Sequence, residues 1–264
     1  MLPPLDLPTD PTKQVFMREA TTAECIDFSD VDPAQEEELT TLFLNTVQRP
    51  EQFIDARTFT AQTRRLLLLW YWLHTVKDTH IVFPYDCGYC GEKHHWDFDM
   101  RRLLDEYRPL QGKAEREFEW KNEIVSVVPL TGEDMHLLEL MRLDWEVAKG
   151  KSEHSGSARK KAALLRMERI IRTVRFVADS VKDPKDQTAE RERRILAMPI
   201  SEFKEFAGMV VTKLSEMDHG VPSVYEDGKI FLLTPPHQCP NSHDAEEVTR
   251  LRVPFRSGDY IPGV

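Results

Sequence analysis

Two strand–turn–strand segments with thiols at their turns constrain this fold more than any other feature of the sequence. The first spans residues 81–100 and carries Cys87 and Cys90 at its turn. The second spans residues 229–255, about 150 residues later, and carries Cys239 at its turn. In each segment a short run of apolar, strand-forming residues is followed after the turn by a stretch, 95–100 or 248–255, that alternates apolar and polar side chains, which is typical of a half-buried strand in a hairpin. If the thiols share one ion, the end of the chain must fold back onto residues 81–100.

The turn Cys87-Gly-Tyr-Cys90-Gly91 has the form of a zinc knuckle. Thiolates at this spacing reach one metal, and the glycine permits the tight backbone that turns amide groups toward sulfur. A structural zinc site needs four ligands. We predict a structural Zn²⁺ bound by Cys87, Cys90, Cys239 and His243. Three other histidines are alternatives for the fourth position, namely His94, His95 and His237.

A metal-free interpretation stays open beside this one. A single Cys-x-x-Cys is moderately specific, so Cys87 and Cys90 could be reduced structural thiols and Cys239 an unrelated buried residue. The second thiol-bearing turn favours the metal. Cys25 stands alone in the sequence, and we expect it to be a small buried side chain.

Charge and apolar patterning exclude several classes of protein. The formal net charge is −10, which disfavours general nucleic-acid binding. The longest apolar run, 66–73, is far shorter than the roughly 20 residues of a membrane-spanning helix. The first residues lack the pattern of a secretory signal, and four cysteines are too few for a disulfide scaffold. We therefore expect a protein of the reducing cytoplasm.

Catalytic signatures are missing from the sequence. It contains no His-x-Glu, no His-Glu-x-x-His, no Gly-x-Ser-x-Gly and no Walker loop. We expect the metal to be structural and the protein not to be an enzyme.

The helical and polar segments complete the predicted organisation. We predict a helix over residues 58–76, with apolar side chains on nearly every side, so this helix should be buried. Thr131 resembles a helix N-cap, with acidic residues in the turn that follows. The segment 158–181 has the pattern of a basic amphipathic helix. Its basic face is either solvated, or an interface with an acidic neighbour, or a nucleic-acid contact through Arg169, Arg172 and Arg175.

We predict an α+β fold in which helices pack around a split zinc-ribbon-like pair of β-hairpins, with an extended N-terminal arm. The predicted segments are the arm (1–14), an α/β part with the first zinc knuckle (15–148), a linker with the basic helix (149–194), and a C-terminal helix with the second knuckle hairpin (195–264). Prolines and polar residues suggest the arm, and Gly, Ser and Lys in 149–157 suggest the linker.

The order of motifs resembles the baseplate hub protein family of T-even-like contractile-tailed bacteriophages. The resemblance rests on the hairpin Phe83-Pro-Tyr-x-Cys-x-x-Cys-Gly91, the helix start Pro129-Leu-Thr-Gly-x-Asp134, a late helix that ends near Gly220, and a Cys-Pro knuckle between strands. The family usually has a second Cys-x-x-Cys knuckle, whereas this chain has Cys239-Pro-Asn-Ser-His243.

The resemblance implies a non-enzymatic, zinc-stabilised component of the virion tail baseplate. Its implied partners are other baseplate proteins of the hub or wedge, the tube or the tape measure, and its implied location is the virion, after assembly in the host cytoplasm. One alternative is a tail-baseplate assembly chaperone that is absent from the virion. Another is a zinc-ribbon nucleic-acid-binding protein.

Overall fold

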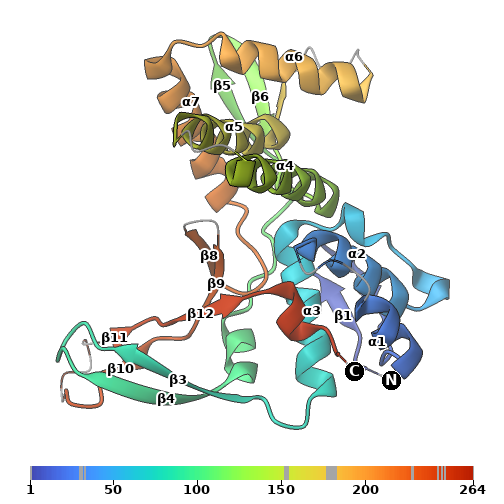
Figure 1. Cartoon of the computed structure of the whole chain (residues 1–264), viewed down its shortest axis with the longest axis vertical. Helices are drawn as coiled ribbons and strands as arrows, with labels where there is room; N and C mark the ends of the chain where they lie inside the picture. The colour runs from blue at the N-terminus through green and yellow to red at the C-terminus, as the bar shows by residue number, and fades with distance from the viewer. Residues whose placement is uncertain are drawn as a thin grey trace.

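The computed structural model describes the chain from Leu2 to Gly263 except for residues 30–31, 33, 152–154, 177–182, 227–228, 243, 245 and 247. At positions 145–151, 155–159, 184–185 and 226 only the backbone is described. The fold is a mixture of helices and small antiparallel sheets (Figure 1), which agrees with the predicted α+β class. None of the described helices is long and apolar enough to cross a bilayer.

The helices are α1 (Thr22–Ser29), α2 (Glu36–Val47), α3 (Ala61–Thr75), α4 (Gly132–Lys151), α5 (Ser155–Thr173), α6 (Pro184–Leu196) and α7 (Ile200–Ser215). Short 3-10 helices are η1 (Pro50–Gln52), η2 (Ala56–Thr58), η3 (Met100–Glu106) and η5 (Ser257–Tyr260).

Within the described residues, the strands form five small sheets. One two-stranded sheet pairs β1 (Leu5–Leu7) with β2 (Asp10–Val15), and another pairs β3 (His80–Asp86) with β4 (Lys93–Asp99). A three-stranded sheet in the order β5–β6–β7 contains β5 (Arg116–Trp120), β6 (Glu123–Val127) and β7 (Val174–Phe176). A second, in the order β12–β9–β8, contains β8 (Ser223–Glu226), β9 (Lys229–Leu233) and β12 (Arg252–Phe255). The last sheet pairs β10 (His237–Gln238) with β11 (Val248–Thr249).

The buried apolar side chains of the described part of the chain form two separate cores. The terminal core takes residues from both ends of the described chain, between Leu2 and Leu103 and between Val221 and Tyr260. The central core takes residues between Leu110 and Met217. This packing groups the first and last parts of the chain together.

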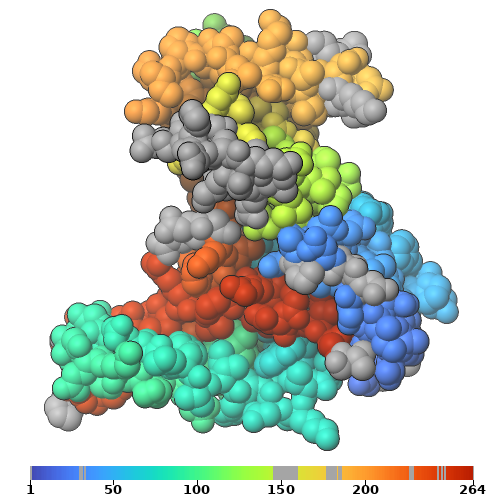
Figure 2. Space-filling model, viewed as in Figure 1, coloured from blue at the N-terminus to red at the C-terminus, as the bar shows by residue number. Residues whose placement is uncertain are grey.

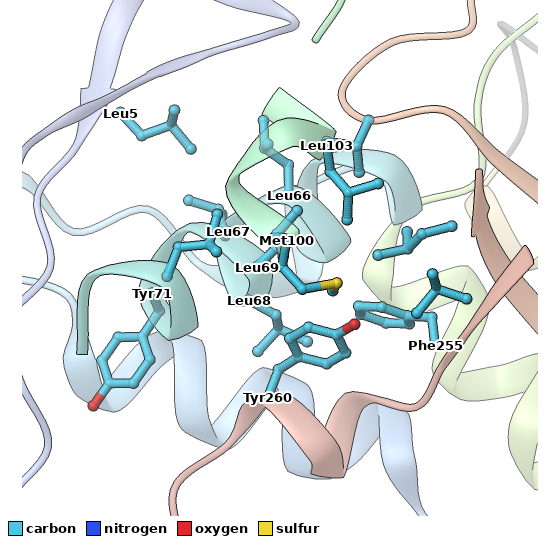
Figure 3. Packing of buried hydrophobic residues seen from close by; sticks show 14 of the residues in the cluster. Leu5, Leu66, Leu67, Leu68, Leu69, Tyr71, Met100, Leu103, Phe255 and Tyr260 are labelled. Carbon is cyan, nitrogen blue, oxygen red and sulfur yellow. The ribbon is translucent and has the colours of Figure 1, made fainter. Parts of the chain in front are cut away.

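Helix α3 lies in the middle of the terminal core. Its residues Leu66, Leu67, Leu68 and Leu69 are all buried, as the apolar pattern of 58–76 predicted. Figure 3 shows this run beside Met100 and Leu103 of η3 and beside Phe255 and Tyr260 of the last segment. An almost fully apolar helix needs cover on all sides, and both ends of the chain supply it.

The chain leaves the terminal core near Arg108 and returns to it near Gly220, and an antiparallel bridge joins these two segments. The amide of Arg108 donates to the carbonyl of Gly220 at 2.9 Å, and the amide of Gly220 donates back to Arg108 at 2.7 Å. Gly220 has a φ of +75°, which a side chain would disfavour. The outgoing and returning segments are therefore held side by side where the central core begins and ends.

The predicted N-terminal arm is wrong. Residues 5–15 form the β1–β2 hairpin, and Leu5, Leu7 and Val15 are buried in the terminal core. The prolines indicated an extended chain correctly, but apolar side chains on alternate positions let that chain pack.

The predicted basic helix is also corrected. It ends at Thr173, and the chain continues as β7, which pairs with β6 from Val125 to Val127. Residues 177–181 of the predicted helix lie outside the described residues. The predicted linker has helical backbone up to Lys151 and again from Ser155, so there the prediction of a linker is wrong. The charged run after Pro184 is helix α6, whose interior is rich in helix-forming residues.

The first turn of α4 joins the central segment to the terminal core. The predicted N-cap is confirmed, because Thr131 Oγ1 accepts the amide of Asp134 at 3.3 Å and Asp134 accepts the amide of Thr131 at 3.0 Å. Directly beside this turn lies the buried guanidinium of Arg64. A Cβ on Gly132 would lie 2.3 Å from Arg64 Nη1, so only glycine lets the two elements approach this closely.

A buried carboxyl group extends this junction. Glu139 of α4 is only 6% exposed, and its two oxygens accept the amide of Glu37 at the start of α2 at 3.2 and 3.0 Å. Burial raises the pKa of Glu139 to about 7, with Glu37 and Glu36 adding to the rise, while the Glu37 amide and Arg142 oppose it. The native state therefore holds this proton at pH values where an unfolded glutamate has lost it.

We expect Glu139→Gln to flatten the pH dependence of stability. Because the folded pKa lies above the unfolded one, the contribution of Glu139 is most favourable below about pH 4.5 and is lost as pH rises through about 7. The neutral amide retains an acceptor for the Glu37 amide but has no charge to bury. We expect the difference in free energy of unfolding between variant and parent, measured by urea unfolding, to shift in favour of the variant by up to roughly 3 kcal/mol from pH 5 to pH 8. Equal gains or losses at both pH values would contradict this.

Candidate metal centre

The first hairpin places two thiols at the tip of a tight turn. Strands β3 and β4 pair from His80–Asp99 to Asp86–Lys93, which leaves residues 87–92 to reverse the chain. The amide of Cys87 donates to the backbone carbonyl of Glu92 at 2.9 Å, and the amide of Gly91 donates to the backbone carbonyl of Cys87 at 3.0 Å. Gly91 has a φ of +73°, the conformation for which the sequence pattern required glycine.

The second hairpin brings one more thiol to the same place. Strand β9 pairs with β12, and further along the hairpin β10 pairs with β11. The turn begins at Cys239, whose carbonyl accepts the amide of Ser242 at 3.1 Å. Figure 1 shows the β3–β4 and β10–β11 hairpins side by side at one end of the molecule, and Figure 2 shows that this end projects from the body.

Four potential ligand atoms meet between the two tips. The sulfur atoms of Cys87, Cys90 and Cys239 and a ring nitrogen of His94 all lie within 4.8 Å of one another. One of these contacts joins Cys90 Sγ to His94 Nε2, at 3.1 Å. Cys87 and Cys239 are buried, whereas Cys90 is exposed. The structure thus brings the three predicted cysteines together, and the histidine beside them is one of the alternatives.

The other histidines fall elsewhere. His243, the predicted fourth ligand, lies outside the described residues. His95 is exposed on the opposite face of β4. His237 is stacked on Trp96 with ring centroids 4.0 Å apart, and its Nε2 lies 3.0 Å from the hydroxyl of Tyr85. The ring of His237 therefore packs between the hairpins instead of joining the cluster.

Strand alternation explains why His94 reaches the cluster. Successive side chains of a strand point to opposite faces, so His94 shares the inner face of β4 with Trp96 and Phe98, both of which are buried. The alternation of residues 95–100 was visible in the sequence, and extending it by one residue would have favoured His94 over His95.

Backbone groups favour the ionised form of one thiol. The amides of Cys90 and Tyr89 point at the sulfur of Cys87 and hold the pKa of that thiol below its usual range. Burial instead raises the pKa of Cys239, although the amide of Asn241 opposes this effect. A bound cation would favour the thiolate at both positions.

Contacts between the tips support the cluster from outside. The amide nitrogen of the Asn241 side chain donates to Glu92 at 2.7 Å and lies 3.9 Å from Cys90 Sγ. On the other side, the hydroxyl of Tyr89 donates to the carbonyl of Val248 at 2.9 Å. Each hairpin thus holds the turn of the other, which reduces the freedom that the ligands would lose on binding an ion.

The donor set fits zinc. Three sulfurs and one imidazole nitrogen form a Cys₃His set, a common type of structural zinc site, whereas the oxygen ligands that Mg²⁺ and Ca²⁺ require are not part of the cluster. Four protein ligands also complete a tetrahedron, the arrangement of structural rather than catalytic zinc.

Comparisons of this chain with protein-family models, with curated protein sequences and with solved structures found no match.

We expect His94→Asn to lower zinc affinity by more than the roughly 10–100-fold that loss of a supporting contact costs. His95→Asn is the matched control, because it makes the same change on the opposite face of β4 and should leave the affinity unchanged. Competition against a chromophoric chelator measures both. If His243→Asn weakens binding and His94→Asn does not, His243 is the fourth ligand.

Proposed function

We propose that Cys87, Cys90, His94 and Cys239 hold a structural Zn²⁺ that joins the two hairpins into a split zinc-ribbon-like unit. The observation that supports this is the meeting of four soft ligand atoms, from hairpins about 150 residues apart, within 4.8 Å. Each hairpin is short and two-stranded at its tip, and such ribbons are marginally stable alone. A structural zinc contributes on the order of 10 kcal/mol to folding in small domains.

We further propose that the protein is a non-enzymatic structural component of a contractile phage tail baseplate. The support is the sequence resemblance, whose most specific part is the hairpin from Phe83 to Gly91. The projecting hairpin pair fits this role, because a narrow arm that contacts neighbouring proteins must be stiff. In this proposal its partners are hub, wedge, tube or tape-measure proteins, and its location is the virion.

The nucleic-acid alternative is less well supported by the contacts of the basic helix. Arg172 is paired with Glu168 at 2.7 Å and with Asp134 at 3.6 Å. Arg175 donates to the backbone carbonyl of Arg172 at 2.7 Å, and Arg169 lies 3.9 Å over the ring of Tyr225. Arg172 and Arg175 would therefore give up internal ion pairs or hydrogen bonds if they bound phosphates.

Cys90→Ser and Cys239→Ser should each release the bound zinc and lower the melting temperature, because a neutral hydroxyl is a poor zinc ligand. Cys25→Ala is the matched control. This thiol lies alone in α1, so its loss should leave zinc content unchanged and cost only packing. Elemental analysis and thermal unfolding measure the two effects. Parent-like melting of both serine variants, with no zinc in the parent, would refute the metal site.

Mass spectrometry of purified particles tests the baseplate role. We expect the chain in purified virions at a fixed ratio to the tube protein. Its presence in unfinished tails and absence from virions would identify an assembly chaperone. DNA binding that weakens steeply with salt and is lost in R169A/R172A/R175A would identify a nucleic-acid-binding protein.

A further inference from the structure

A cleft lies between two helices of the central segment, α4 and α5, and the elements α2, β8, β9 and β12, and it shares no residue with the metal centre. Its volume is about 430 Å³, within the range of sites that bind ligands. Helices α2, α4 and α5 and the sheet β12–β9–β8 supply its walls. Apolar side chains form part of the lining, among them Leu138, Leu165 and Phe231.

The acidic side chains of this cleft already have partners within the protein. Glu37 pairs with the buried guanidinium of Arg64 at 3.1 Å. Glu139 accepts the amide of Glu37 and lies 3.8 Å from Arg142. Glu36 accepts the amide of Ser257 at 3.4 Å. Glu37 is therefore paired with a cation and Glu139 with a backbone amide, whereas Glu36 accepts one long amide hydrogen bond and forms no ion pair within the described residues.

Three basic side chains of the cleft have no such partner. Within the described part of the chain, Arg169 of α5, Lys229 of β9 and Arg256 beyond β12 form no ion pair with a carboxylate. Arg169 instead stacks on the ring of Tyr225, a contact that uses the face of the guanidinium and not its N–H groups. A cluster of uncompensated cations is unusual on a chain whose net charge is −10.

We propose that this cleft binds a short segment of a partner protein in which Asp or Glu residues flank a large apolar side chain. The apolar lining would take the apolar side chain, and Arg169, Lys229 and Arg256 would pair with the flanking carboxylates. Clusters of arginine that read acidic motifs are an established mode of peptide recognition, and apolar contact supplies the remaining affinity. The proposal is independent of the zinc site, because the cleft shares no residue with it.

Selection from a display library of random heptapeptides on the full-length protein tests this without prior choice of a sequence. Enriched peptides should carry an acidic residue next to Leu, Ile, Phe, Trp or Met. Their affinity, measured by fluorescence anisotropy, should fall roughly ten-fold or more in R169Q/K229Q/R256Q. It should also fall in Leu165→Gln, which keeps the cations but makes the lining polar.

The matched control is K77Q/K113Q/K204Q, which removes the same charge from exposed positions outside the cleft. It should bind the peptides like the parent, and zinc content should be the same in all variants. Equal binding by the two triple variants, or selection that yields no acidic motif, would overturn the proposal. A dimer in sedimentation that only R169Q/K229Q/R256Q dissociates would assign the cleft to a second copy and would overturn it as well.

Discussion

The packing of the last forty or so residues onto α3 is the interaction on which the rest of the structure depends. Helix α3 buries its leucine run completely, and no single neighbour can cover a helix that is apolar on nearly every side. Phe255 and Tyr260 cover one side of it, with their rings stacked 4.7 Å apart. The same return of the chain places the β10–β11 pair beside β3–β4. The approach of Cys239 to Cys87 and Cys90 follows from that burial of apolar surface.

Side-chain contacts join the two hairpins in the absence of a metal. The stacked rings of Trp96 and His237, with the hydroxyl of Tyr85 at the imidazole, fill the space between them behind the ligand cluster. Aromatic packing therefore aligns the hairpins without an ion. A metal would bind ligands that already lie close together. Arrangements of this kind bind tightly because less conformational entropy is lost.

Buried polar groups hold α2, η2 and α3 together. The guanidinium of Arg64 is 2% exposed and donates to Thr41 Oγ1, to the carbonyl of Ala56 and to Glu37. Burial of such a group is costly unless nearly every donor is used, so the elements around it must keep their positions. Glu139 extends this network into α4. The walls of the cleft are consequently held by polar contacts, while its basic side chains remain available.

Local patterns in the sequence determined the individual elements. Short apolar runs followed by alternating strands identified both hairpins, the glycine after Cys90 identified the knuckle turn, and Thr131 identified the start of α4, because each of these signals acts over a few residues. The errors came where long-range packing overrode a local signal. Leu5 and Leu7 bury a segment that its prolines marked as an arm, and pairing with β6 turns the end of the basic helix into β7.

The identity of the histidine in the cluster, the grouping of both chain ends into one core and the position of the cleft depend on tertiary structure. Spacing along the chain could place His94, His95, His237 and His243 near a turn, but only the face of a paired strand directs one ring toward the thiols. The sequence by itself determined which chemical groups are present and which local shapes they adopt. Which of those groups meet was decided by the burial of α3, since that burial brings distant segments together regardless of their separation along the chain.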